Sequence, residues 1–171
     1  MFDLYGYQKI NKILSAQEVN DLKEFLVKSL DHSIQLEFGE DYNSKNLMKL
    51  VNQYYEQKKY NINENKKKIL AGMYPPEIRL NERFIEIVSN KNLVEKLSEI
   101  TKIEIQNLHL PPMARYVLPN NTGAMVPAHQ DETYNTHMSN FVTLWITLVE
   151  IDNECGGLRI FKHDKNKKVE K

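Results

Sequence analysis

His129 and Asp131 are the residues whose types and spacing best suit metal chemistry in this chain. They lie in the segment Met125–Asp131, which we predict to be an extended strand. Residues i and i+2 of a strand point to the same side, roughly 6 to 7 Å apart at their Cα atoms, so both side chains can reach one ion while Gln130 faces away. An imidazole and a carboxylate are two of the three ligands in the set that holds non-haem Fe(II). The third ligand has to come from elsewhere.

Turns and strands are predicted on both sides of this pair. Upstream, Pro119–Ala124 is rich in turn residues. Downstream, Phe141–Val149 alternates and is rich in β-branched and aromatic residues, which predicts a strand. Asp152–Gly157 predicts a turn, and Leu158–Phe161 begins a further strand.

The predicted strand Phe141–Val149 has two different faces. One face is wholly apolar and predicts core; it consists of Val142, Leu144, Ile146 and Leu148. The other face places two hydroxyls beside an indole and suits a half-polar pocket; it consists of Phe141, Thr143, Trp145, Thr147 and Val149.

Taken in order, these motifs resemble the phytanoyl-CoA dioxygenase family of Fe(II)- and 2-oxoglutarate-dependent oxygenases. The resemblance rests on His129-Gln-Asp131, then a strand with Trp145 at its centre, then Asn153–Phe161, which is similar to the family's E-N-G-G-L followed by a strand. The amino terminus agrees, since Gly6–Ser15 resembles the short strand and L-S-x-E-E that open the family. The resemblance covers the whole chain in order, and the middle third matches in character only.

The resemblance implies a double-stranded β-helix, a jelly-roll or cupin-like barrel whose mouth holds the iron. It implies the cofactors Fe(II) and 2-oxoglutarate, with His129 and Asp131 as metal ligands, and hydroxylation of an aliphatic C–H of a small-molecule substrate. Related halogenases have a small residue in place of the aspartate, so Asp131 favours hydroxylation.

The resemblance also suggests residues for the cofactor. An aromatic near the place of Trp145 lines the 2-oxoglutarate pocket of related enzymes, so we assign Trp145, Thr147 and Arg115 to cofactor binding. Arg115 can bind a carboxylate through two hydrogen bonds. Core packing for Trp145, an ordinary strand position for Thr147 and an exposed strand position for Arg115 are the alternatives.

The second histidine of the family's ligand set comes from a late strand of the barrel. His163 follows Asp131 by only 32 positions, too few to cross the barrel and return, and it lies where the family has a surface turn. We therefore expect a carboxy-terminally truncated chain that lacks the distal His and the Arg that grips 2-oxoglutarate, and that is inactive alone. Strand edges left unpaired would invite self-association. His109 and His137 are expected to be structural or solvent-facing.

Composition sets the bounds on these expectations. The chain has 171 residues and 41% hydrophobic content, which predicts one domain, 1–171, with a real core. Lys+Arg and Asp+Glu are equal at 23 each, so no bulk charge attracts nucleic acid or anionic lipid. A lone Cys155, the lack of a signal peptide and the lack of a run of about 18 apolar residues predict a cytoplasmic protein without a membrane segment.

The amino-terminal part, 1–101, is predicted to be mainly helical. A short strand over Tyr7–Leu14 precedes a capping box at Ser15–Glu18. The following helix carries apolar residues at helical spacing, namely Val19, Leu22, Phe25, Leu26 and Leu30. A second helix from Ser44 carries Leu47, Leu50, Val51 and Tyr54 on one side. Further helices are predicted over Asn81–Val88 and Asn92–Ile100, and a solvated loop over Asn61–Asn65.

The remainder, 102–171, is predicted to be β-rich and to carry the metal motif. Ile103–Leu110 and Met113–Leu118 predict strands on either side of Pro111-Pro112. Helices first and strands afterwards favour an α+β fold, with helices packed on a sheet, here an incomplete barrel.

Two other classes of function stay open. The first is a non-catalytic fragment or pseudoenzyme that acts as an interaction module through exposed strand edges. The second is a cupin-like protein that binds another metal ion.

Overall fold

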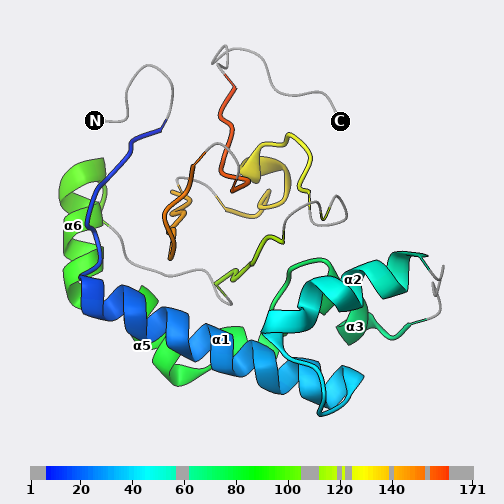
Figure 1. The fold of residues 1–171 in the computed structure, drawn as a ribbon. Helices are drawn as coiled ribbons and strands as arrows, with labels where there is room; N and C mark the ends of the chain where they lie inside the picture. The colour runs from blue at the N-terminus through cyan, green and yellow to red at the C-terminus, as the bar shows by residue number, and fades with distance from the viewer. Residues whose placement is uncertain are drawn as a thin grey trace. The chain divides into compact units, whose positions relative to one another are not determined.

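The computed structural model describes residues 7–56, 62–104, 112–118, 121, 125–138, 141–152 and 155–161. They fall into two compact units, Met1–Ala124 (unit 1) and Met125–Lys171 (unit 2), each taken here by itself. In unit 1 the helical elements are α1 (Ala16–Phe38), η1 (Ser44–Asn46), α2 (Leu47–Glu56), α3 (Glu64–Leu70), α4 (Pro76–Arg79), α5 (Glu82–Val88) and α6 (Lys91–Thr101) (Figure 1). Unit 2 contributes the short 3₁₀ helix η3 (Asp131–Thr133). The expectation of one domain over 1–171 stays a prediction.

The predicted capping box starts α1. The Glu18 backbone N–H donates to the Ser15 hydroxyl at 3.2 Å, and the Ser15 backbone N–H donates to Glu18 Oε2 at 2.7 Å. Both hydrogen bonds satisfy amides that the first turn of a helix leaves without partners. The helix ends at Gly39, whose φ of 111° suits glycine.

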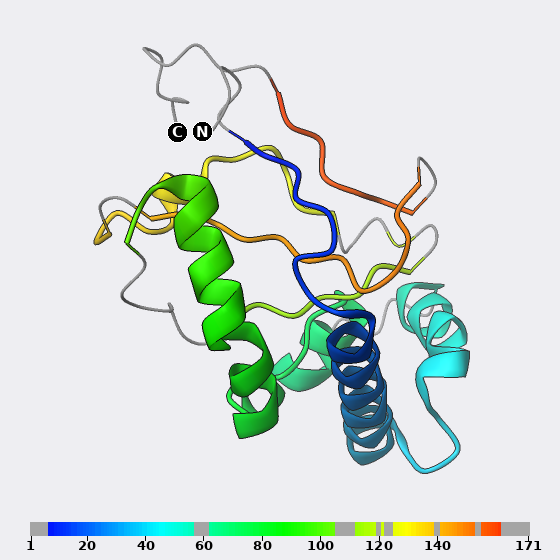
Figure 2. The same ribbon diagram turned by 90° about the vertical axis from the view of Figure 1, so that its left-hand side faces the viewer.

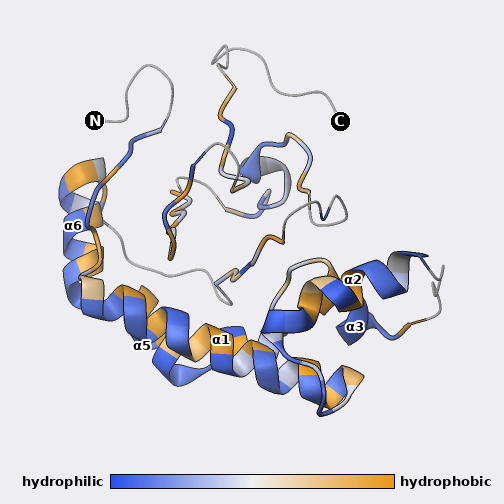
Figure 3. Ribbon diagram, in the orientation of Figure 1, coloured by the Kyte–Doolittle hydropathy of each residue, from blue (hydrophilic) through white to orange (hydrophobic). Residues whose placement is uncertain are grey.

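One face of α1 supplies the centre of the core. Figure 3 shows apolar residues along one side of this helix and polar residues along the other. Its buried residues recur every four positions, as an amphipathic helix requires: Leu22, Leu26, Leu30 and Ile34. Helices α3 and α5 pack against α1, and α2 packs against α3. The predicted apolar side of α2 is confirmed, because Leu47, Leu50 and Val51 are buried.

Asparagine side chains start three of the later helices. Asn63, Asn81 and Asn90 accept backbone N–H groups at the first turns of α3, α5 and α6. The predicted loop over Asn61–Asn65 is therefore wrong at its end, since α3 begins at Glu64 and buries Ile69 and Leu70. The two helices predicted within 81–100 are confirmed as α5 and α6.

The segment 112–118 docks onto the end of α3 through its backbone. Met73 and Arg115 form an antiparallel bridge, in which the Tyr116 N–H donates to the Gly72 carbonyl at 3.0 Å. The Tyr116 hydroxyl donates to the Ile69 carbonyl, and its ring meets Tyr74 edge to face at 5.3 Å. Burial raises the pKa of both tyrosine hydroxyls well above the usual range.

The predicted strands are not formed in the described part of the chain. No strand is assigned in four of the predicted segments, 7–14, 113–118, 141–149 and 158–161. Figure 2 draws these segments as coil without arrows. Most of the strand predicted over Ile103–Leu110 lies outside the described residues. A strand is stable only when a neighbour accepts and donates its backbone hydrogen bonds, and the described ranges contain one isolated bridge. The β half of the α+β prediction is therefore not seen here.

The two predicted faces of Phe141–Val149 differ in burial in the predicted direction, although neither is buried. On the face predicted to be core, Val142, Ile146 and Leu148 are half-buried and Leu144 is 36% exposed. This face is the more covered of the two, but it is not core. On the other face, Thr143 and Thr147 are exposed and Trp145 is 49% exposed. The predicted turn that follows is present at Gly156, which has a φ of 68°.

Of the helices in the described ranges, none combines the length and the apolar character that a membrane crossing needs.

Candidate metal centre

The side chains of His129 and Asp131 meet, as predicted. The His129 Nε2 atom lies 3.2 Å from Asp131 Oδ1. The backbone that brings them together is not the predicted strand, because η3 begins at Asp131 itself. The Thr133 N–H donates to the Gln130 carbonyl at 3.0 Å, and the Tyr134 N–H donates to the Asp131 carbonyl at 3.1 Å. A tight turn therefore starts at Asp131, and the two side chains meet although the predicted strand is not formed.

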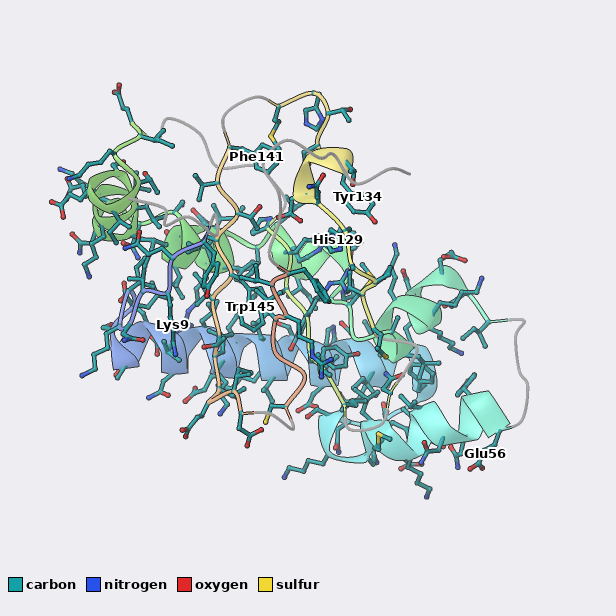
Figure 4. All side chains as sticks on the ribbon, turned by 90° about the horizontal axis from the view of Figure 1, so that it is seen from above. Lys9, Glu56, His129, Tyr134, Phe141 and Trp145 are labelled. Atoms are coloured by element: carbon teal, nitrogen blue, oxygen red, sulfur yellow. The ribbon has the colours of Figure 1, made fainter. Side chains whose placement is uncertain are left out.

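Hydrogen bonding and ring packing fix the orientation of His129. Its Nδ1 atom lies 2.8 Å from the Pro127 carbonyl oxygen. A carbonyl can only accept, so Nδ1 carries a proton, and Nε2 is the nitrogen left to face Asp131. The Tyr134 ring meets the imidazole edge to face at 5.2 Å, and Figure 4 shows the two side chains beside each other. The imidazole is thus oriented with Nε2 toward Asp131, and Nε2 is the nitrogen that could bind a metal.

The two carboxylate oxygens of Asp131 have different neighbours. Oδ1 faces His129, while Oδ2 accepts the Thr143 hydroxyl at 2.5 Å. The backbone carbonyl of Asp131 accepts the Asn135 side-chain amide at 3.0 Å. The histidine and aspartate side chains are 31% and 41% exposed, so the pair is open to solvent on one side.

The geometry of the pair fits one metal ion. Ligand atoms bound at about 2.1 Å and at right angles to each other are about 3.0 Å apart, close to the distance between Nε2 and Oδ1. An imidazole nitrogen without a proton repels a carboxylate oxygen. The close approach of the two atoms is therefore favourable only when a metal cation or a proton lies between them. A group of three possible ligands is not found among the described residues. His109 and His163 lie outside those residues.

The three residues assigned to cofactor binding are not brought together by any described contact. Trp145 and Thr147 are exposed in unit 2. Arg115 is exposed in unit 1, where its backbone pairs with Met73. Their roles toward 2-oxoglutarate stay predictions.

Sequence reasoning did not assign a role to three groups around the pair: the Pro127 carbonyl, the Tyr134 ring and the Thr143 hydroxyl. For Thr143 a signal existed, because it shares the hydroxyl-bearing face of its segment with Trp145 and Thr147. For Pro127 and Tyr134 there was none, since a three-residue turn cannot be distinguished from a strand end by its residue types.

Comparison with known proteins identifies a family for this chain. The model of the phytanoyl-CoA dioxygenase (PhyH) family matches residues 2–171. A search of the curated proteins and a search of the solved structures found no match. The family implies a double-stranded β-helix fold and typically uses Fe(II) and 2-oxoglutarate. Because the match covers nearly the whole sequence, the chain belongs to the phytanoyl-CoA dioxygenase family.

Proposed function

We propose that this chain carries part of the active site of an Fe(II)- and 2-oxoglutarate-dependent dioxygenase that hydroxylates an aliphatic C–H of a small molecule. The observation that supports this proposal most is the 3.2 Å approach of His129 Nε2 to Asp131 Oδ1, with the other ring nitrogen held by Pro127. Two ligands in this arrangement belong to the 2-His-1-carboxylate set. Family membership supplies the expected cofactors.

Each residue of the pair has a separate task in the proposed site. His129 binds the metal through Nε2, and the Pro127 carbonyl keeps the ring in the correct tautomer. Asp131 binds through Oδ1 and supplies negative charge. When bound, Fe(II) with 2-oxoglutarate and oxygen supplies the oxidising chemistry that converts C–H to C–OH. Because Nε2 and Oδ1 lie 3.2 Å apart, the two residues could hold one ion together, and a further ligand and the co-substrate would complete the site.

Trp145, Thr147 and Arg115 are the residues we propose for the 2-oxoglutarate side of the site. An indole and a hydroxyl at positions i and i+2 can line one wall of a pocket, and a guanidinium can pair with a carboxylate. A carboxylate at Asp131, where related halogenases have a small residue, favours hydroxylation as the reaction.

A metal titration tests the proposal. Co(II) and Mn(II), which resist oxidation better than Fe(II), are titrated calorimetrically into the purified chain and into the variants His129→Ala and Asp131→Ala. We expect one saturable site, with affinity lowered at least about 10-fold in each variant. His32→Ala is the matched control, since His32 is an exposed histidine on α1, and its affinity should equal that of the wild type. A lack of saturable binding, or binding that both variants retain, would refute the metal site.

Turnover gives the second measurement. Because the described residues place two ligands together and not three, 2-oxoglutarate conversion to succinate by this chain should be near background. Robust succinate formation that His129→Ala abolishes would show that a third ligand from this chain completes the site.

A non-catalytic interaction module is the second candidate. The observation that favours it is the exposure of apolar side chains late in unit 2: Leu158 is 59% exposed, Ile160 53% and Phe161 70%. Such residues suit a surface that another chain covers. Concentration-dependent sedimentation that Phe161→Ser reverses, together with an absence of metal binding, would favour this candidate.

A further inference from the structure

The shortest polar contact of the candidate metal centre joins two segments of unit 2. Thr143 lies 12 residues after Asp131, and its hydroxyl reaches Asp131 Oδ2 at 2.5 Å. An ionised carboxylate can only accept, so the hydroxyl donates. A distance at the short end of the range for O–H···O⁻ hydrogen bonds marks a charge-assisted contact.

This contact makes the two oxygens of Asp131 inequivalent. Oδ2 is occupied by Thr143, whereas Oδ1 is directed at His129 Nε2. A carboxylate with both oxygens free can bind a cation through both of them and so fill two positions on the ion. A carboxylate with one oxygen engaged by a hydroxyl binds through the other. A site that must admit both 2-oxoglutarate and oxygen requires the second arrangement, because each occupied position is lost to them.

We infer that Thr143 is a positioning residue that keeps Asp131 a one-oxygen metal ligand. The inference rests on the proposed function, since it assumes that Asp131 binds the metal. The Thr143 hydroxyl would decide whether Asp131 binds a metal through one oxygen or two, and therefore which ions the site prefers. Ca²⁺ accepts two-oxygen carboxylates readily, whereas ions that demand regular geometry do not. Loss of the Thr143 hydroxyl should therefore shift the preference of the site from Mn(II) toward Ca(II).

The alternative is that Thr143 only ties its own segment to the η3 turn. In that case its loss would lower stability without changing which metal is preferred. The ratio of Mn(II) to Ca(II) affinity separates the two roles, because a general loosening of the turn weakens both ions alike.

The experiment compares hydroxyl removal with hydroxyl retention in the full chain. Thr143→Val keeps the shape of the side chain and removes the hydroxyl, while Thr143→Ser keeps the hydroxyl. Thr136→Val makes the same change at an exposed threonine of the same unit. Mn(II) and Ca(II) affinities are measured by calorimetry, and folding is checked by the thermal midpoint. Thr143→Ala replaces the valine variant if that variant does not fold.

We expect Thr143→Val to lower the Mn(II) affinity about 10-fold and the ratio of Mn(II) to Ca(II) affinity by a similar factor. Thr143→Ser should stay within about threefold of the wild type, and Thr136→Val should equal it. Wild-type affinities and an unchanged ratio in Thr143→Val, while Asp131→Ala abolishes binding, would overturn the role of Thr143 and leave the proposed function intact. Equal losses in the valine and serine variants would also overturn it. If the wild type binds neither ion, both proposals fail together.

Discussion

The two units differ in where their apolar side chains lie. All the buried hydrophobic residues of the described chain belong to unit 1, from Leu14 to Ala114. In unit 2, Trp145 and Phe161 are 49% and 70% exposed. Helices satisfy their backbone hydrogen bonds within one segment, so a few amphipathic helices can close a core, whereas extended chain needs neighbouring strands for the same purpose. Among the described residues of unit 2 no hydrophobic side chain is buried, and Asp131 accepts side-chain hydrogen bonds from Thr143 and Asn135.

The largest effect is expected in the core of unit 1. Ile34 lies on the buried face of α1 with 0% exposure. Ile34→Ala should lower the free energy of unfolding by about 2 to 5 kcal/mol, since it removes buried methyl groups and leaves a cavity. The change is measured from urea denaturation midpoints.

Leu36 provides the matched control on the same helix. It lies two residues further on and is 73% exposed. Leu36→Ala should change the free energy of unfolding by no more than about 0.5 kcal/mol. Equal losses in the Ile34 and Leu36 variants would mean that the buried face of α1 does not carry the stability of unit 1.

A smaller effect is expected in unit 2. Leu144 is 36% exposed, so Leu144→Ala should lower the free energy of unfolding by at most about 1 kcal/mol, because stabilisation follows the apolar area removed from water. Trp145→Ala should fall in the same range. A loss for Leu144→Ala as large as that for Ile34→Ala would show that unit 2 has a core of its own. If Trp145→Ala lowered the free energy of unfolding much more than Leu144→Ala, the face that carries Trp145 would be the packed one.

The smallest effect concerns the carboxylate of Glu18 in the capping box of α1. The backbone N–H of Ser15, and then its hydroxyl, lower the pKa of Glu18 below its usual value of 4.5. A carboxyl group whose pKa is lowered in the folded state contributes stability above its unfolded pKa, and this contribution is lost as the pH falls through the folded pKa. The free energy of unfolding of Glu18→Gln should therefore change less than that of the wild type as the pH falls from about 5.

Ser15→Ala separates the two hydrogen bonds of that box. It should cost about 1 kcal/mol at neutral pH, as the loss of a helix cap does. It keeps the Ser15 backbone N–H, so most of the dependence on pH should remain. If Glu18→Gln follows the wild-type pH profile, the carboxylate does not stabilise the start of α1.

The fold could be predicted from the sequence where structure is local. Ser15 and Glu18 mark the start of α1, and apolar residues spaced by four mark its buried face. The start of α3 was missed because Asn63, within a polar stretch, fits a loop as well as it fits a cap. The strand over 141–149 was predicted from composition and alternation, which state what a strand prefers but not whether a partner pairs with it.

At the candidate site, sequence predicted the meeting of two side chains but not its cause. His129 and Asp131 were identified by their types and spacing, and they lie 3.2 Å apart. The η3 turn at Asp131 is local, but its residue types also suit a strand end. The hydrogen bond from Thr143 joins residues 12 apart in the chain, and a pattern of residue types does not contain such a contact. Arg115 lies in unit 1, and its part in the site stays a prediction.

The position of the only tryptophan has a practical consequence. Trp145 belongs to unit 2, whereas every described α-helix belongs to unit 1. Indole emission therefore follows the surroundings of unit 2, and far-ultraviolet circular dichroism follows the helices of unit 1. The chain carries an optical reporter for each unit without any label. Two melting curves recorded on one sample give the cooperativity between the units directly, since coincident transitions are the signature of a single two-state process.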